Sequence, residues 1–240
     1  LVIFVALLLL TLFTTWYERR VVAKMQNRPG PNRNGPFGLL QPIADGIKLA
    51  MKQGITPVNA DLAVYLLAPI IAATAAMMIF AVVPMGPMVS IFGTETPLQL
   101  TDFSVSVLYV LAIASVGIYG IVLAGWSSAN KYALIGGLRA AGQLIAYELP
   151  MVLAVVGVVI QAGTMNLSGI VAAQANGEIF GFSGIGNPYF ITQFVAMGIF
   201  LIAVQAELGQ TPFDMPIAES ELVTGYITEY SGLRFLLFFI

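Results

Sequence analysis

Long apolar runs alternate with shorter polar connections along the whole chain. A helix needs about 20 apolar residues to span the hydrocarbon core of a bilayer. Lipid offers the backbone no hydrogen-bond partners, so we expect these runs to form helices rather than open strands. They predict six spans, the first and the last of them truncated, at residues 1–17, 62–84, 104–125, 137–162, 189–208 and 233–240.

The polar connection between the first two runs predicts an amphipathic helix. It begins with "NRPGPNRNGPFG", which is full of helix breakers. In the following "QPIADGIKLAMKQ", Gln41, Asp45, Lys48 and Lys52 are spaced by four, three and four residues, and apolar residues cover the other face. Such a helix either lies on the cytoplasmic membrane surface or packs against the other spans.

The composition supports a membrane protein. Of the 240 residues, 58% are hydrophobic and 9% are charged, and the mean hydropathy is +0.90, whereas soluble domains carry roughly 25% charged residues. The chain has no Cys and no His, the usual ligands of Fe–S clusters, haem and structural zinc. We therefore predict an all-α polytopic membrane protein with no metal site. We expect one transmembrane domain over 1–240, a fragment incomplete at both ends.

The basic residues predict the orientation. All ten Lys and Arg residues fall on one side of the six-span trace, and the connections on the other side, 85–103 and 163–188, contain none. The positive-inside rule makes the basic side cytoplasmic or its equivalent. We predict a multi-pass protein of a bacterial or archaeal plasma membrane, or of an organellar inner membrane.

One carboxylate, Glu148, lies near the middle of the fourth predicted span. Placing a charged carboxylate there costs on the order of 2.5–3.5 kcal/mol on insertion scales, so such residues are functional by default. Two interpretations are open. Glu148 is either a proton carrier, which we favour, or a structural acid held by Tyr147, Gln143 or Arg139 of the same helix.

A second group of acids lies in "AELGQTPFDMPIAESELVTGYITEY", residues 206–230. Neither Lys, Arg nor His occurs between Arg139 and Arg234, so we expect these acids to have no partner within the chain. The residues among them are apolar and aromatic, and "IAESELVTGY" predicts a short helix. The segment is either a solvated acidic loop or a semi-buried proton relay. Its acids are Glu207, Asp214, Glu219, Glu221 and Glu229.

Three long motifs resemble the signature regions of one family. They are "YERRVVAKMQNRPGPNRNGPFGLLQPIADGIKL", "GWSSANKYALIGGLRAAGQLIAYELP" and "AELGQTPFDMPIAESELVTGYITEYSGLRFLLFF". In this order, over nearly the whole chain, they resemble the H subunit family of respiratory complex I, the NADH-quinone oxidoreductase, which includes mitochondrial subunit 1. The resemblance implies an eight-helix membrane protein that joins a hydrophilic redox arm to antiporter-like, proton-pumping membrane subunits.

The resemblance also implies a quinone chamber, with quinone as the substrate and NADH, FMN and Fe–S clusters only on partner subunits. Nucleic acid plays no part. An acidic path leads from the chamber into the membrane. The positions that resemble this proton relay are Glu148, Glu207, Asp214, Glu219, Glu221 and Glu229. The positions that resemble the quinone chamber are Arg19, Asp45, Phe235 and Phe239.

Two departures of the chain from the family pattern, which is close to "AExxRxPFDLPEAESEL", change its charges. Gln210 stands where the pattern has Arg, and Ile217 where it has Glu, so the relay has one carboxylate fewer. The expected function is a membrane component of a proton-pumping NADH:quinone oxidoreductase. The alternatives are the equivalent subunit of a membrane-bound hydrogenase or other complex I-like enzyme, an ion-coupled secondary transporter, and a structural anchor for a hydrogenase-like arm.

Overall fold

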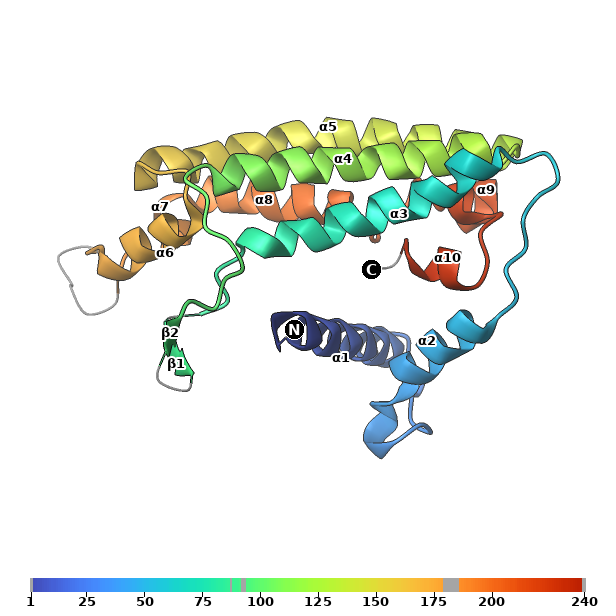
Figure 1. Ribbon diagram of the computed structural model, residues 1–240, viewed down its shortest axis with the longest axis horizontal. Helices are drawn as coiled ribbons and strands as arrows, with labels where there is room; N and C mark the ends of the chain where they lie inside the picture. The colour runs from blue at the N-terminus through green and yellow to red at the C-terminus, as the bar shows by residue number, and fades with distance from the viewer. Residues whose placement is uncertain (1, 87, 92–93, 179–185, 239–240) are drawn as a thin grey trace. The chain divides into compact units, whose positions relative to one another are not determined.

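The structure is a computed structural model that describes residues 2–86, 88–91, 94–178 and 186–238 (Figure 1). The chain forms two compact units. A smaller unit joins Leu1–Ile55 to Tyr230–Phe239, and a bundle unit comprises Thr56–Glu229 with Ile240. The described residues of both units are mostly helical, in agreement with the predicted all-α membrane class.

The smaller unit contains the helix predicted in the first polar connection. Helix α2 (Gln41–Met51) has a proline in its first turn and ends where the backbone of Lys52 becomes extended. Helix α1 (Val2–Met25) continues well beyond the first predicted span. A 3-10 turn, η1 (Pro36–Gly38), and a short helix, α10 (Leu233–Leu236), complete the unit.

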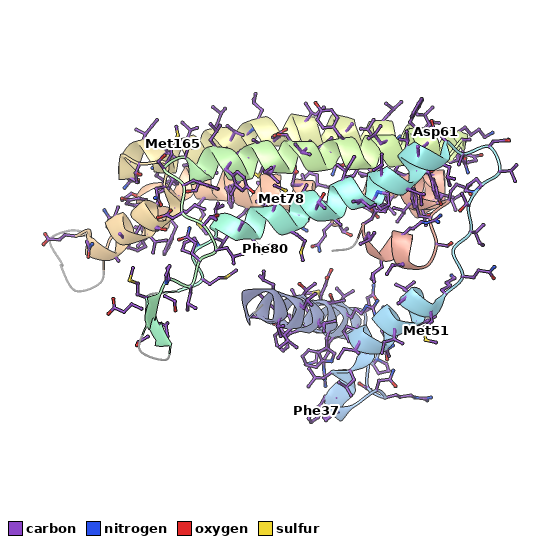
Figure 2. All side chains as sticks on the ribbon, in the orientation of Figure 1. Phe37, Met51, Asp61, Met78, Phe80 and Met165 are labelled. Carbon is purple, nitrogen blue, oxygen red and sulfur yellow. The ribbon has the colours of Figure 1, made fainter. Side chains whose placement is uncertain are left out.

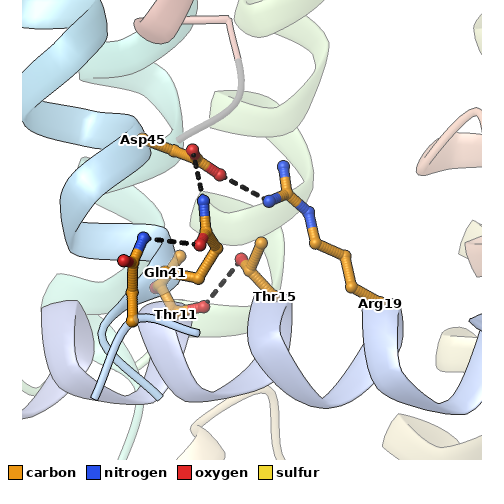
Figure 3. A network of polar contacts seen from close by, with 6 residues as sticks. Thr11, Thr15, Arg19, Gln41 and Asp45 are labelled. Carbon is orange, nitrogen blue, oxygen red and sulfur yellow. Dashed lines mark hydrogen bonds and ion pairs between the residues drawn. The ribbon is translucent and has the colours of Figure 1, made fainter. Parts of the chain in front are cut away.

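Polar residues of α2 point toward α1 (Figure 3). Nη1 of Arg19 lies 2.5 Å from Oδ2 of Asp45, and Nε2 of Gln41 donates to Oδ1 of Asp45 at 2.9 Å. Burial raises the pKa of Asp45, but the hydrogen bonds from Arg19 and Gln41 and the charges of Arg19 and Lys48 outweigh it. Together they hold the pKa of Asp45 below its ordinary value.

Apolar residues of the same unit remain exposed. The side chains of Ile43, Ile47 and Met51 on α2 are 40%, 55% and 83% exposed, and Phe37 of η1 is 71% exposed. Figure 2 labels Phe37 and Met51, both on the outside of this unit. Gln41 and Asp45 of the polar face of α2 therefore find partners within the unit, while its apolar face is available to lipid or to another protein.

The bundle unit is built from four helices that lie side by side (Figure 1). Helix α3 packs on α4, α4 on α5, and α5 on α8. Among the described helices, three are long and apolar enough to cross a membrane, namely α3 with its 3-10 extension η2, α4 and α5. The bounds are α3 (Leu62–Ile79), η2 (Phe80–Val82), α4 (Ser106–Ser127), α5 (Lys131–Ala162) and α8 (Phe194–Glu207).

The fifth predicted span is interrupted. A four-residue helix, α7 (Tyr189–Thr192), is separated from α8 by Gln193, whose backbone is non-helical. The side chain of Gln193 donates to the carbonyl of Gly157 at 2.8 Å and to Gln161 at 2.6 Å, both on α5. Because α8 has 14 residues, it falls short of a full span, so the count of six spans stays a prediction.

Several short elements have no counterpart in the predicted spans. Strands β1 (Val89–Ile91) and β2 (Thr94–Thr96) pair antiparallel in one connection, and α6 (Leu167–Asn176) lies in the next. The acid-rich stretch of residues 206–230, called the acidic segment below, contains α9 (Glu219–Leu222) and η3 (Gly225–Ile227). Its predicted short helix is therefore present but has a single turn.

Small residues set the closest contacts of the bundle. A Cβ at Gly125 would lie 2.6 Å from the carbonyl oxygen of Ala133, so Gly125 lets α4 approach α5 closely. A Cβ at Gly136 would lie 2.6 Å from Cα of Gly225 and 2.7 Å from the nitrogen of Tyr226. Gly136 therefore brings the backbone of η3 directly onto α5.

We predict that Gly136→Ala weakens the docking of η3 on α5. Its methyl group would collide with rigid backbone, and overpacking of this kind costs about 1–3 kcal/mol. The control is Gly142→Ala on the same helix, where a Cβ meets nothing within 4 Å. Limited proteolysis in detergent measures the result. We expect faster cleavage within 208–229 in the Gly136 variant alone, and equal cleavage rates would contradict the contact.

We also predict a pH dependence from Asp45. Because its pKa is lowered in the folded protein, ion pairing with Arg19 stabilises the fold above the ordinary aspartate pKa of about 3.9 and is lost as the pH falls through the lowered value. The side chains of Arg19 and Asp45 are 51% and 32% exposed, so we expect no more than about 1 kcal/mol.

The unfolding midpoint should therefore drop less in acid for Asp45→Asn than for the unmodified protein. Thermal unfolding in detergent, followed from about pH 7 to about pH 3, measures this difference, with Asp102→Asn in the bundle unit as the control. Parallel pH curves for the unmodified protein and the Asp45 variant would show that the pair contributes nothing.

Candidate functional site

The candidate site is centred on α5, which carries Glu148 into the bundle. The hydroxyl of Ser115, on the neighbouring helix α4, donates to Oε1 of Glu148. The same hydroxyl also lies 3.1 Å from the carbonyl oxygen of Leu111. The polar contact of Glu148 therefore comes from α4 and not from its own helix.

The three residues of α5 that the sequence suggested as partners of Glu148 contact other parts of the protein. Gln143 and Arg139 bind the acidic segment, as described below, and the ring of Tyr147 packs edge-on against Phe213 with centroids 5.1 Å apart. The interpretation of Glu148 as an acid held by these three residues is wrong, because they all lie on the face of α5 that meets residues 206–229.

Glu207 is the last residue of α8 and the closest functional neighbour of Glu148. The two carboxylates interact electrostatically across the α5–α8 contact. Oε2 of Glu207 is buried and has no hydrogen-bond partner among the described residues. A buried carboxylate oxygen without a donor is costly, so this oxygen needs a proton of its own or a water molecule. The pair Glu148–Glu207 is thus suited to holding and releasing a proton.

Glu221 corrects one expectation from the sequence. Its Oε2 lies 2.6 Å from Nη1 of Arg139, and the two side chains are 61% and 36% exposed. The prediction that the acids lack a partner within the chain is therefore wrong for Glu221. The sequence could not reveal this ion pair because the two residues are 82 positions apart and meet only when α9 packs on α5.

Glu229 also accepts hydrogen bonds from other residues of the bundle unit. Nδ2 of Asn130 donates to Oε1 of Glu229 at 2.6 Å, and the side-chain oxygen of Asn130 caps the start of α5. The hydroxyl of Tyr65 donates to the backbone carbonyl of Glu229 at 2.7 Å. Glu229 borders a polar cavity of about 470 Å³, together with Asn59, Ser128, Asn130 and Lys131.

The remaining two acids lie near Arg139. Asp214 is exposed and, with Arg139, Ser220 and Glu221, borders an open cavity of about 600 Å³. Glu219 is the first residue of α9, and its side chain lies outside the described part of the structure. The bundle thus brings Glu148 and Glu207 together and places Asp214 beside the Arg139–Glu221 pair.

The predicted quinone positions belong to the smaller unit. Arg19 and Asp45 form the ion pair between α1 and α2, and Phe235 lies on α10, which packs against α2. Phe239 lies outside the described residues. This unit therefore combines a polar pair with the exposed apolar side chains of α2.

Several residues were not expected from the sequence in the roles that they have at these sites, among them Asn130, which holds Glu229. Ser115 and Gln143 are ordinary polar residues on apolar helices, and Gln41 looks like part of a solvated face. Buried Tyr226 has a pKa raised to about 12 by burial, so it is neutral throughout the physiological range. A polar residue inside a predicted span was the one available signal, and it applied to Ser115 and Gln143.

Metal ligands are not gathered anywhere in the described residues. Within that part of the chain, no group of three or more His, Cys, Asp or Glu side chains is placed to hold a metal ion. The acids described above are instead spread over separate contacts.

Comparison with known proteins agrees with the resemblance. The family model described as NADH dehydrogenase matches residues 1–240. The H subunit of the NADH-quinone oxidoreductase of Thermomicrobium roseum is 51% identical over 98% of this chain and 69% of its own length. The corresponding H subunits of Frankia casuarinae and Frankia alni are 50% and 49% identical over 99% of this chain. The chain spans about half the length, 51%, of these two relatives. With a match over its whole length, the chain belongs to the NADH dehydrogenase family.

Proposed function

We propose that this chain is the membrane component, equivalent to the H subunit of its relatives, of a proton-pumping NADH:quinone oxidoreductase in a bacterial plasma membrane. The names of its bacterial relatives support this assignment over a membrane-bound hydrogenase, a secondary transporter or a structural anchor. The observation that carries the proton-coupling role is the Glu148–Glu207 pair, with its buried and unsatisfied oxygen, at a helix contact.

In this proposal the protein acts on protons and leaves electrons to its partners. Quinone takes up two electrons and two protons to become quinol. The 240 residues offer no Cys or His to hold a redox centre, so the electrons come from NADH through FMN and Fe–S clusters on a hydrophilic arm. Ser115 orients Glu148, and Glu207 exchanges a proton with it directly or through water.

In this proposal, the change in charge during quinone reduction alters the protonation of the acids. A negative charge near the acidic segment favours protonation of the closest carboxyl, and loss of that charge favours release. Asp214, Glu219, Glu221 and Glu229 belong to the same acidic path as Glu207. Antiporter-like membrane subunits are the expected recipients of the resulting proton movement.

The smaller unit supplies the proposed quinone chamber. The Arg19–Asp45 pair offers charged hydrogen-bonding groups to a quinone headgroup, and the exposed apolar residues of α2 offer a surface to its hydrocarbon tail. Phe235 and Phe239 complete the set carried over from the family. The same apolar face supports a position for α2 at the cytoplasmic membrane surface.

Glu148→Gln is the first test. We expect the rate of proton translocation to fall at least about 10-fold, because an amide cannot take up or release a proton, while assembly of the complex is retained. Proton uptake into inverted membrane vesicles, measured with a pH-sensitive dye during NADH oxidation, gives the rate. Glu95→Gln, in strand β2, is the control. Unchanged proton translocation in an assembled Glu148 variant would rule out the relay.

Arg19→Gln tests the quinone chamber. Losing the charged donor should raise the KM for quinone about 10-fold, since a hydrogen bond to a charged group is worth about 1.5–3 kcal/mol. The number of protons moved per electron should stay the same. Lys24→Gln, in the last turn of the same helix, is the control. An unchanged KM would separate Arg19 from quinone binding and leave the Glu148 test unaffected.

A further inference from the structure

One face of α5 contacts the acidic segment at four levels. Gly136, Arg139, Gln143 and Tyr147 follow one another at intervals of three, four and four residues, which places them on a single face of a helix. Gly136 touches the backbone of η3, Arg139 pairs with Glu221, and Tyr147 packs on Phe213. Gln143 makes the buried polar contact in the middle of this row.

The amide of Gln143 uses both of its hydrogens on the backbone of the acidic segment. Gln143 is 5% exposed. Its Nε2 donates to the carbonyl oxygen of Ala206 at 2.8 Å and to that of Phe213 at 2.9 Å. An amide nitrogen has two donors, so both are engaged in bonds of ordinary length.

The two carbonyls are the ones that immediately precede Glu207 and Asp214. A peptide unit is planar, so fixing a carbonyl oxygen also fixes the nitrogen and Cα of the next residue. Ala206 lies in the last turn of α8, so by holding its carbonyl Gln143 ties this helix end, and Glu207 with it, to α5 opposite Glu148. By holding the carbonyl of Phe213, it sets the position of the Asp214 backbone. One side chain thus holds the residue that precedes each of two acids, Glu207 at the end of α8 and Asp214 in the loop.

The other three contacts between α5 and the acidic segment fix the positions of Glu207 and Asp214 less directly. The Arg139–Glu221 pair is partly exposed, and exposed pairs contribute about 0–1 kcal/mol. Gly136 holds η3 and not the residues next to Glu207 or Asp214, and the contact of Tyr147 with Phe213 is a packing of rings without a hydrogen bond among those described. Loss of the Gln143 donors would leave the carbonyl of Phe213 short of a partner, which costs about 1–3 kcal/mol for a buried group left unsatisfied, whereas the carbonyl of Ala206 would keep its bond from the N–H of Gly209. The acidic segment would then be expected to move.

We infer that Gln143 is a positioning residue of the proton relay, which acts by fixing the separation between Glu207 and Glu148 and the placement of Asp214. This inference rests on the proposed function of the acids. It assigns no proton transfer to Gln143 itself, because a neutral amide does not titrate. Its effect passes through the backbone to Glu207, and the charged group that faces Glu207 from α5 is Glu148.

The test replaces Gln143 by Met in the complete, assembled complex. Met is close to Gln in length and volume but has no donor, so it removes the two hydrogen bonds without opening a large cavity. We expect NADH-driven proton translocation to fall by about 10- to 100-fold, the range that misplacement of a reacting group by about 1 Å produces. We also expect the pH profile of coupled quinone reduction to move, because the two carboxyls no longer interact at the same distance.

Gln161→Met is the matched control. Gln161 lies on the same helix, but its amide binds Thr192 and Gln193 at the break between α7 and α8. This variant should keep the pH profile of the unmodified complex. A second measurement combines Gln143→Met with Glu207→Gln. If Gln143 acts through Glu207, the double variant should have the pH profile of Glu207→Gln alone.

Three results would overturn the inference: an unchanged pH profile in assembled Gln143→Met, an equal shift in Gln161→Met, or an additive shift in the double variant. If the Met variant fails to assemble, Gln143→Asn replaces it, since it keeps the amide and withdraws it by one methylene. An unchanged profile in the Asn variant would also overturn the inference. Loss of proton translocation in Glu148→Gln alongside an unchanged Gln143 variant would reject only the positioning role, whereas normal translocation in Glu148→Gln would reject the proposed function.

Discussion

A polar group inside an apolar helix bundle must find its partner within the protein, because lipid supplies none. The bundle unit meets this requirement mainly along α5. Ser115 of α4 satisfies Glu148, and Gln143 donates to the carbonyls of Ala206, in the last turn of α8, and of Phe213, beyond it. Gln193 binds α5 where α7 and α8 are interrupted. The arrangement of the acidic segment follows from this requirement, since its backbone is held by side chains that already belong to a long and continuous helix.

The acids differ in the contacts that hold them, and in the proposed relay this difference orders them along a path. Glu221 is paired with a cation, and Glu229 accepts a hydrogen bond from an amide. Glu207 has a buried oxygen without a described partner and a second carboxylate nearby. A chain of acids with equal surroundings would have no preferred place for a proton. Here the surroundings change from the paired acids of the segment to the unpaired acid at the helix contact.

The helices could be predicted from the sequence more fully than the site. Apolar runs marked α3, α4 and α5, and the four-three-four spacing of polar residues marked α2, because these patterns depend only on neighbouring residues. Gln193 interrupts an apolar run without any Pro or Gly, so the break before α8 gave no local signal. The partners of Glu148 and Glu221, by contrast, come from Ser115 and Arg139, 33 and 82 positions away. Such pairs depend on how helices pack, which no local pattern specifies.

The departure at Gln210 has a physical consequence within the acidic segment. The family pattern places a cation there, between the first two acids, whereas here the cation that pairs with the segment is Arg139 of α5. A cation on the segment would move with its acids, but Arg139 belongs to the same rigid helix as Glu148 and Gln143. Any shift of the segment relative to α5 therefore changes the Arg139–Glu221 distance, the hydrogen bonds of Gln143 and the Glu148–Glu207 interaction together. Docking on α5 thus links the position of the loop acids to that of the pair inside the bundle.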